Sequence, residues 1–277
     1  MSELSSDELS NEDFDVGVSD DEFVIRATID RADKRNALNE NVMQGINNVL
    51  DTADDSEVRV VVIRGAGGTF CSGGDLTEMA RLIDASPQEY REYLSSISTL
   101  MAKMRRTDAL VVAAVEGYCL AGGMGIATAS DFVVAADDAT FGTPEKDIGL
   151  FPMQVMAPIM RAVHEKKGLK MLFTGEKFGA DEAEKIGLIT DAVPADDFDD
   201  ELDSFVNNLV NSSPTMISMG KEAYYHQAEM SFDDSLSYLK EMFSLLVMSD
   251  DTEEGINAKM MGENPDWKAR SGENKQE

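Results

Sequence analysis

The sequence predicts an α/β fold, because patterns typical of strands and helices alternate along its first half. The predicted strands are runs of β-branched or small apolar residues, and they lie at 23–29, 58–64, 110–115 and 131–136. Helical patterns separate them, notably at about 40–52 and 77–106. From residue 152 onward the pattern is mostly helical, with one short strand predicted at 188–193.

Two glycine-rich turns, at residues 65–76 and 115–125, each follow a predicted strand and precede a predicted helix. A turn without bulky side chains lets a substrate approach the backbone, and the free N–H groups at the helix start then point towards it. One such turn is equally well explained by close packing of a glycine against a neighbouring element. Because the arrangement occurs twice, we expect an N–H group from Gly74 and one from Gly122 to hold one carbonyl oxygen between them.

The formal net charge of −29 indicates a strongly acidic surface. Repulsion from phosphates argues against nucleic acid as a partner, while a basic partner stays open. The acidic residues are spread over many segments, which resembles proteins that work in very high salt, where counter-ions screen the self-repulsion. We therefore expect a halophilic source and a loss of stability at low ionic strength.

Several features predict a cytoplasmic protein without a metal centre. Cys71 and Cys119 are too few for a disulfide scaffold, and His164 and His226 have no metal-ligand spacing. The N-terminus shows no signal-peptide pattern, and no apolar stretch reaches membrane-spanning length. We expect a disordered acidic tail at 1–20, a folded core at 21–195, a helical region at 196–262 and a polar tail at 263–277.

Four segments in order resemble the enoyl-CoA hydratase/isomerase (crotonase) family. They are residues 30–39, 70–76, 121–131 and 141–145. The resemblance covers about residues 22–262 and implies a spiral of ββα units. It also implies a helical C-terminal region that forms homotrimers or dimers of trimers, an acyl-CoA thioester as substrate, and no metal or redox cofactor.

The resemblance also implies roles for individual residues. Gly74 and Gly122 fall on the family's oxyanion-hole positions, in agreement with the two glycine turns, and Glu145 falls on a catalytic glutamate. A carboxylate beside the substrate carbons would move protons while the two N–H groups stabilise the enolate. The residues implied in coenzyme A binding are Lys34, Arg35, Ala37, Gly73, Asp75 and Leu76.

This chain departs from the family pattern at Gly125, where family hydratases carry their other glutamate. We expect hydration of a trans-2-enoyl-CoA to a 3-hydroxyacyl-CoA, the commonest activity of chains with this resemblance. The alternative is isomerisation of a 3-enoyl-CoA to a 2-enoyl-CoA, which needs only one base. Asp147 is a candidate substitute for the missing acid, although a solvated loop aspartate explains it more simply. Dehalogenation is disfavoured because the nucleophilic aspartate would fall near Met153.

Two other classes of function stay open. A non-catalytic acyl-CoA binder would keep the same fold, and a nucleotide-binding Rossmann protein is weakly suggested by the glycines at 122–125, which lack the required spacing. For the acyl pocket we expect a wall from residues 77–100 and 148–160. The expected wall residues are Met79, Leu82, Leu150, Phe151 and Met156.

Overall fold

The computed structural model describes residues 4–267 and confirms the α/β class. A six-stranded sheet has the order β1-β2-β3-β4-β6-β9, with β1 antiparallel and all other pairs parallel. Its strands are β1 (Phe14–Val18), β2 (Val24–Ile29), β3 (Val60–Gly65), β4 (Leu110–Val115), β6 (Phe132–Ala136) and β9 (Asp191–Val193). All the strands predicted in the first half of the chain belong to this sheet.

The N-terminal segment is part of the fold, so the prediction of a disordered tail at 1–20 is wrong for the residues from 4 onward. Helix α1 (Ser6–Leu9) precedes β1, which pairs with β2 from Phe14 opposite Ile29 to Val18 opposite Ile25. Phe14 and Val16 are buried whereas Asp15 and Gly17 are exposed, because alternate residues of a strand face the core. The many acidic residues of this segment made the alternation hard to recognise in the sequence.

A second, three-stranded sheet was not predicted. It consists of β5 (Tyr118–Leu120), β7 (Thr140–Gly142) and β8 (Phe178–Gly179), in the order β5-β7-β8. Strand β5 lies within the second glycine turn, and it pairs in parallel with the first turn through Cys71 and Cys119. The two glycine turns are therefore neighbours in space.

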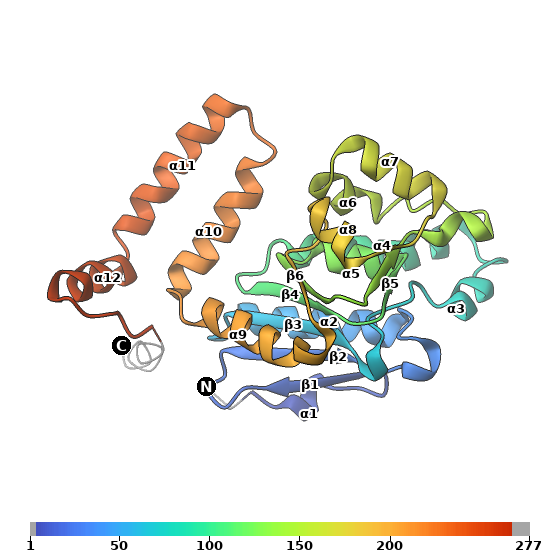
Figure 1. Ribbon diagram of the computed structural model, residues 1–277, viewed down its shortest axis with the longest axis horizontal. Helices are drawn as coiled ribbons and strands as arrows, with labels where there is room; N and C mark the ends of the chain where they lie inside the picture. The colour runs from blue at the N-terminus through green and yellow to red at the C-terminus, as the bar shows by residue number, and fades with distance from the viewer. Residues whose placement is uncertain (1–3, 268–277) are drawn as a thin grey trace.

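Helices cover both faces of the large sheet (Figure 1). One face packs against α2 (Glu40–Asp54), α4 (Pro87–Met104) and α5 (Gly122–Ala129) in the main apolar core. The other face packs against the apolar stripe of α9 (Phe198–Val210). The shorter helices around this body are α3 (Leu76–Arg81), α6 (Met156–Ala162), α7 (Glu165–Thr174) and α8 (Ala180–Lys185).

The last three helices project from the body as an arm (Figure 1). They are α10 (Pro214–Gln227), α11 (Phe232–Val247) and α12 (Asp250–Met261). A buried ion pair fixes the base of the arm, since Lys221 Nζ lies 2.7 Å from Asp131 Oδ2 and donates to the carbonyls of Met104 and Ala109. Helices α9 to α12 lie within the predicted helical region at 196–262, and residues 268–277 of the predicted polar tail lie outside the described residues.

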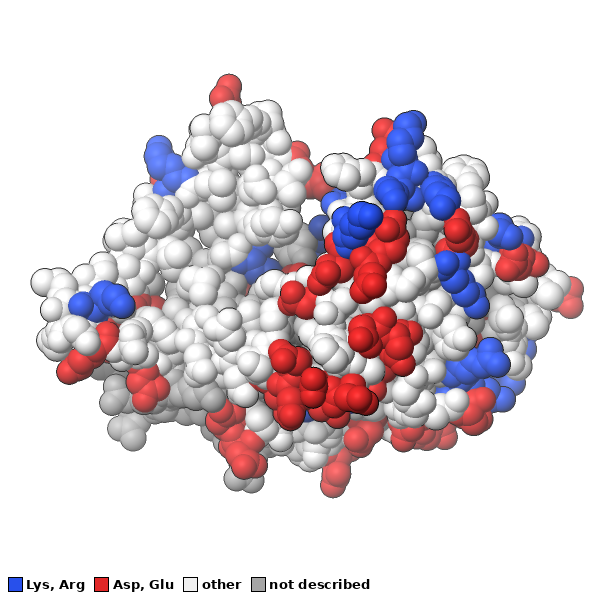
Figure 2. Space-filling model, in the orientation of Figure 1, with Lys and Arg blue, Asp and Glu red and all other residues white. Residues whose placement is uncertain are grey.

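The surface is unevenly charged. Figure 2 shows acidic side chains gathered over α9, whereas Lys and Arg side chains gather over α7. Across residues 4–267, no helix has both the length and the apolar character needed to cross a membrane.

Candidate active site

A cavity of about 590 Å³ contains the three residues that were predicted to act on the substrate. Gly74, Gly122 and Glu145 all line it, although they come from two glycine turns and a later loop. Helices α3 and α4 form one wall, and residues 144–155 form another. The fold thus brings together groups that are up to 71 residues apart in the sequence (145 − 74).

The backbone around Gly74 is held by a parallel bridge to Leu38. Leu38 donates its N–H to the carbonyl of Gly73 at 2.7 Å, and Asp75 donates its N–H to the carbonyl of Leu38 at 2.9 Å. Gly122 is the first residue of α5, so its N–H has no acceptor within the helix. Within the described part of the chain, neither Gly74 N nor Gly122 N donates to a backbone or side-chain acceptor.

The two turns contact each other so closely that little space remains for side chains. A Cβ placed on Gly122 would lie 3.4 Å from Gly74 N, and one placed on Gly73 would lie 2.8 Å from Cβ of Ala121. Ala121 itself has φ 48° and ψ −117°, a conformation that an alanine rarely adopts. Strain of this kind costs about 1–3 kcal/mol and occurs preferentially at functional sites. Because the turns lie this close together, the N–H groups of Gly74 and Gly122 are neighbours at the cavity.

Glu145 lies on the 3₁₀ helix η3 (Pro144–Ile148), where Pro144 occupies the first position. Its side chain is half-buried, and its Oε2 atom is buried without a hydrogen-bond partner among residues 4–267. Burial raises the pKa of Glu145 above its usual value, because a low-dielectric environment disfavours the charged carboxylate. An unpaired carboxylate of raised pKa, open to a cavity, is suited to accept and return protons.

The position of the other family glutamate is closed. A Cβ on Gly125 would lie 2.6 Å from Cγ1 of Val155 and 3.1 Å from the sulfur of Met101, so apolar side chains occupy the space. Asp147 lines the cavity, but its side chain is 64% exposed and its carboxylate lies 2.6 Å from Lys146 Nζ. Glu145 is therefore the only partly buried carboxylate among the described residues that line the cavity.

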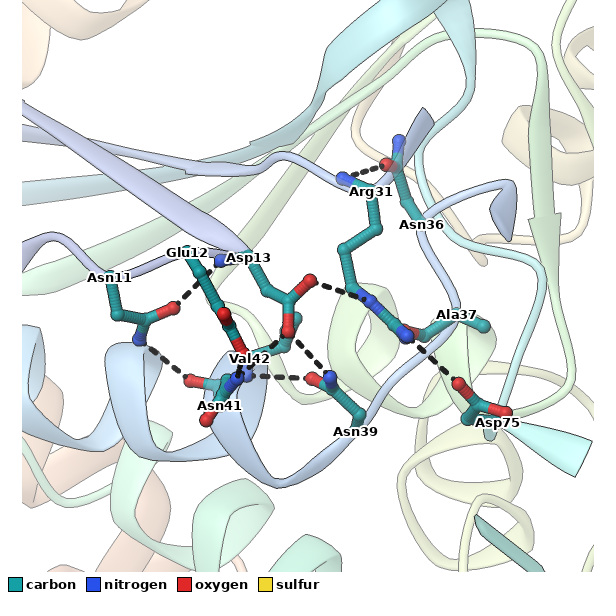
Figure 3. Close-up of polar contacts among 10 residues, drawn as sticks. All are labelled: Asn11, Glu12, Asp13, Arg31, Asn36, Ala37, Asn39, Asn41, Val42 and Asp75. Carbon is teal, nitrogen blue, oxygen red and sulfur yellow. Dashed lines mark hydrogen bonds and ion pairs between the residues drawn. The ribbon is translucent and has the colours of Figure 1, made fainter. Parts of the chain in front are cut away.

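Arg31 links the loop that carries Ala37 to Asp75, the residue that follows Gly74 (Figure 3). Its guanidinium donates to Asp75 Oδ2 at 2.9 Å, to Asp13 Oδ1 at 3.0 Å and to the carbonyl of Ala37. Asp75 also caps α3 by accepting from the N–H of Thr77 at 2.8 Å. Burial opposes ionisation of Asp75, but the hydrogen bonds from Arg31 and Thr77, together with the positive charge of Arg31, outweigh it and lower the pKa of Asp75. The Asp75 carboxylate, predicted to contact coenzyme A, is thus engaged inside the protein.

Of the remaining predicted coenzyme A residues, three are exposed and two are buried. Lys34 and Arg35 are exposed, and the carbonyl of Arg35 accepts from the N–H of Ser72 at 3.0 Å, which joins their loop to the first glycine turn. Leu76 is 59% exposed and lines the cavity. Ala37 and Gly73 are buried and offer mainly backbone. In the described chain, no group of three or more His, Cys, Asp or Glu side chains could hold a metal ion.

The expected acyl wall is partly correct. Met79, Leu150 and Phe151 line the cavity, whereas Leu82 and Met156 lie outside its lining. The predicted wall range 77–100 contains the cavity face of α4, but none of the residues on that face was named. Its residues are Tyr90, Tyr93, Leu94 and Ile97, whose spacing of three and four is itself the signal of one helix face.

Comparison with known proteins places this geometry in a family. The enoyl-CoA hydratase/isomerase family model matches residues 20–270. The 2,3-dehydroadipyl-CoA hydratase of Escherichia coli (strain K12) is 31% identical over 261 residues, which are 91% of this chain and 98% of that protein.

Solved structures share the fold, which agrees with the predicted crotonase-like architecture. An enoyl-CoA hydratase of Mycobacterium smegmatis superposes with a TM-score of 0.88 at 28% identity, covering 93% of this chain and 99% of that one. The human enoyl-CoA hydratase domain-containing protein 3 gives a TM-score of 0.87 at 28% identity, covering 92% of this chain and 100% of that one. The chain therefore belongs to the enoyl-CoA hydratase/isomerase family.

Proposed function

We propose that the chain binds an enoyl-CoA thioester with its carbonyl oxygen on the N–H groups of Gly74 and Gly122, and that Glu145 moves the proton. The observation that carries this proposal is the buried, unpaired Oε2 of Glu145 in the same cavity as two unengaged N–H donors. Exposed Lys34 and Arg35 are suited to the phosphates of coenzyme A, because they lie on the loop joined to the first glycine turn.

The reaction favoured by this site is isomerisation of a 3-enoyl-CoA to a trans-2-enoyl-CoA. The Glu145 carboxylate takes a proton from C2, and the C–H electrons form a dienolate whose negative charge lies largely on the thioester oxygen. The same carboxyl group then returns the proton to C4, so the double bond moves from C3–C4 to C2–C3. Each N–H donor contributes roughly 10²–10³ to the rate, and a positioned base contributes roughly 10²–10⁴.

Hydration of a trans-2-enoyl-CoA is the second candidate, and the names of the relatives favour it. Hydration must add water at C3 as well as a proton at C2. Val155 and Met101 fill the position from which a second glutamate would hold that water. A hydratase would therefore rely on Glu145 alone, or on Asp147 at the exposed rim of the cavity.

The test compares two substrates in molar potassium chloride. Purified protein is mixed with trans-3-hexenoyl-CoA and, separately, with trans-2-hexenoyl-CoA, and the conjugated enoyl-thioester absorbance is followed. A gain of absorbance with the first substrate supports isomerisation. Rapid loss with the second, with 3-hydroxyacyl-CoA as product, supports hydration instead. Tight binding of hexanoyl-CoA with no turnover of either substrate would mean a non-catalytic acyl-CoA binder.

A further inference from the structure

The acyl cavity is lined mainly by apolar side chains. Leu38, Met43 and Val155 are buried at its floor, while Leu94 and Ile148 are 39% and 55% exposed. Of the described residues that line the cavity, none is Lys, Arg or His. An acyl chain entering this space therefore meets mainly hydrocarbon, with two phenols and a few polar or acidic side chains, but no positively charged side chain among the described residues.

Among the described residues, the charged side chains that line this cavity are acidic. Glu145 and Asp147 line it, and the neighbouring Lys146 is bound to Asp147. Burial and, secondarily, the negative charges of Glu78 and Asp75 raise the pKa of Tyr93 to about 12. The phenol of Tyr93 on α4 thus has the acidic side chains of Glu78 and Asp75 near it.

We infer that this site selects acyl groups with an uncharged distal end and excludes those that carry a terminal carboxylate. A terminal carboxylate on the acyl chain would lose its hydration in the cavity and would find no cation to pair with among the described lining residues. It would also be repelled by Glu145 and by the acidic residues beside Tyr93. The inference rests on the proposed binding of acyl-CoA thioesters. It separates this chain from the Escherichia coli relative named for 2,3-dehydroadipyl-CoA, a thioester with a terminal carboxylate.

The test uses two saturated thioesters of equal length that differ only at the distal end. Titration calorimetry of hexanoyl-CoA and adipoyl-CoA, in one buffer, measures selectivity independently of turnover. We expect hexanoyl-CoA to bind at least about 30-fold more tightly, since an unpaired charge in a binding site typically costs this much or more. Equal dissociation constants would overturn the inference.

Variants at Leu94 provide a gain-of-function test. Leu94→Arg places a guanidinium at the partly exposed rim, and Leu94→Gln is the matched neutral control. We expect the arginine variant to tighten adipoyl-CoA by about tenfold relative to hexanoyl-CoA, and the glutamine variant to leave their ratio unchanged. An unchanged ratio in the arginine variant counts against the inference.

Failure of the inference and failure of the proposed function are distinguishable. Selective binding of hexanoyl-CoA without turnover of any enoyl thioester would refute the proposed function and leave the selectivity standing. Equal turnover of matched hexenoyl and dehydroadipyl thioesters would refute the selectivity and leave the function standing.

Discussion

The contact between Gly125 and Val155 can be tested by a double-mutant cycle. Alanine at residue 125 gains roughly 1 kcal/mol of helix propensity, but its Cβ would lie 2.6 Å from Val155 Cγ1, and overpacking of this kind costs about 1–3 kcal/mol. Gly125→Ala should therefore lower the free energy of unfolding by about 1 kcal/mol. Val155→Ala removes two buried methyl groups, worth roughly 2 kcal/mol.

In the double variant, the new methyl group occupies space that Val155 has vacated. We expect Gly125→Ala to become neutral or stabilising in the Val155→Ala background, with a coupling energy of at least about 1 kcal/mol. Urea unfolding in molar potassium chloride, followed by circular dichroism at one protein concentration, measures all four proteins. Additive effects would mean that Val155 does not close the position of the second glutamate.

Four further predictions address the base, the oxyanion loop, the arm and the charge. Glu145→Gln should lower turnover by roughly 10³-fold with hexanoyl-CoA binding retained. Because the pKa of Glu145 is raised in the folded state, the wild type loses stability as pH rises through that pKa. Thermal melts should therefore show the variant as the more stable protein at pH 8, and this advantage should be lost by about pH 4. Arg31→Met, which removes the ion pair with Asp75, should lower kcat about tenfold with little change in KM, and Arg31→Lys should recover part of the lost kcat. Equal losses in kcat and in the folded fraction would indicate a purely structural role for Arg31. Phe243 on α11 is 66% exposed, and if copies of the chain cover the arm as a homotrimer, Phe243→Asp should shift the mass measured by light scattering towards the monomer. Lowering potassium chloride from 2 M to 0.1 M should lower the melting temperature by several degrees, because the net charge of −29 is then poorly screened, and an unchanged melting curve would count against the salt-adaptation hypothesis.

The strands and helices of the core were predictable because their signals are local. The strand at 110–115 is a run of apolar residues. Asn39, a residue type that favours the position before a helix, caps α2 by accepting from the N–H of Val42 at 3.0 Å. Strand β1 was missed because only Phe14 and Val16 mark its buried face within an acidic segment.

The candidate site was only partly predictable, because its decisive features depend on contacts distant in sequence. The glycine turns indicated Gly74 and Gly122, but the parallel bridge through Cys71 and Cys119 that brings the turns together has no local signal. Likewise, the sequence shows that Gly125 lacks a carboxylate, but it does not show that Val155, thirty residues later (155 − 125), fills the space.

The central claim is that Glu145 and two backbone N–H groups move a double bond without a second carboxylate. The most direct measurement is the rise in enoyl-thioester absorbance when trans-3-hexenoyl-CoA is mixed with the wild-type protein and with Glu145→Gln. The proposed mechanism predicts rapid conversion to trans-2-hexenoyl-CoA by the wild type and a rate roughly 10³-fold lower for the variant. Equal rates for the two proteins, or hydration of trans-2-hexenoyl-CoA with no isomerisation by the wild type, would contradict it.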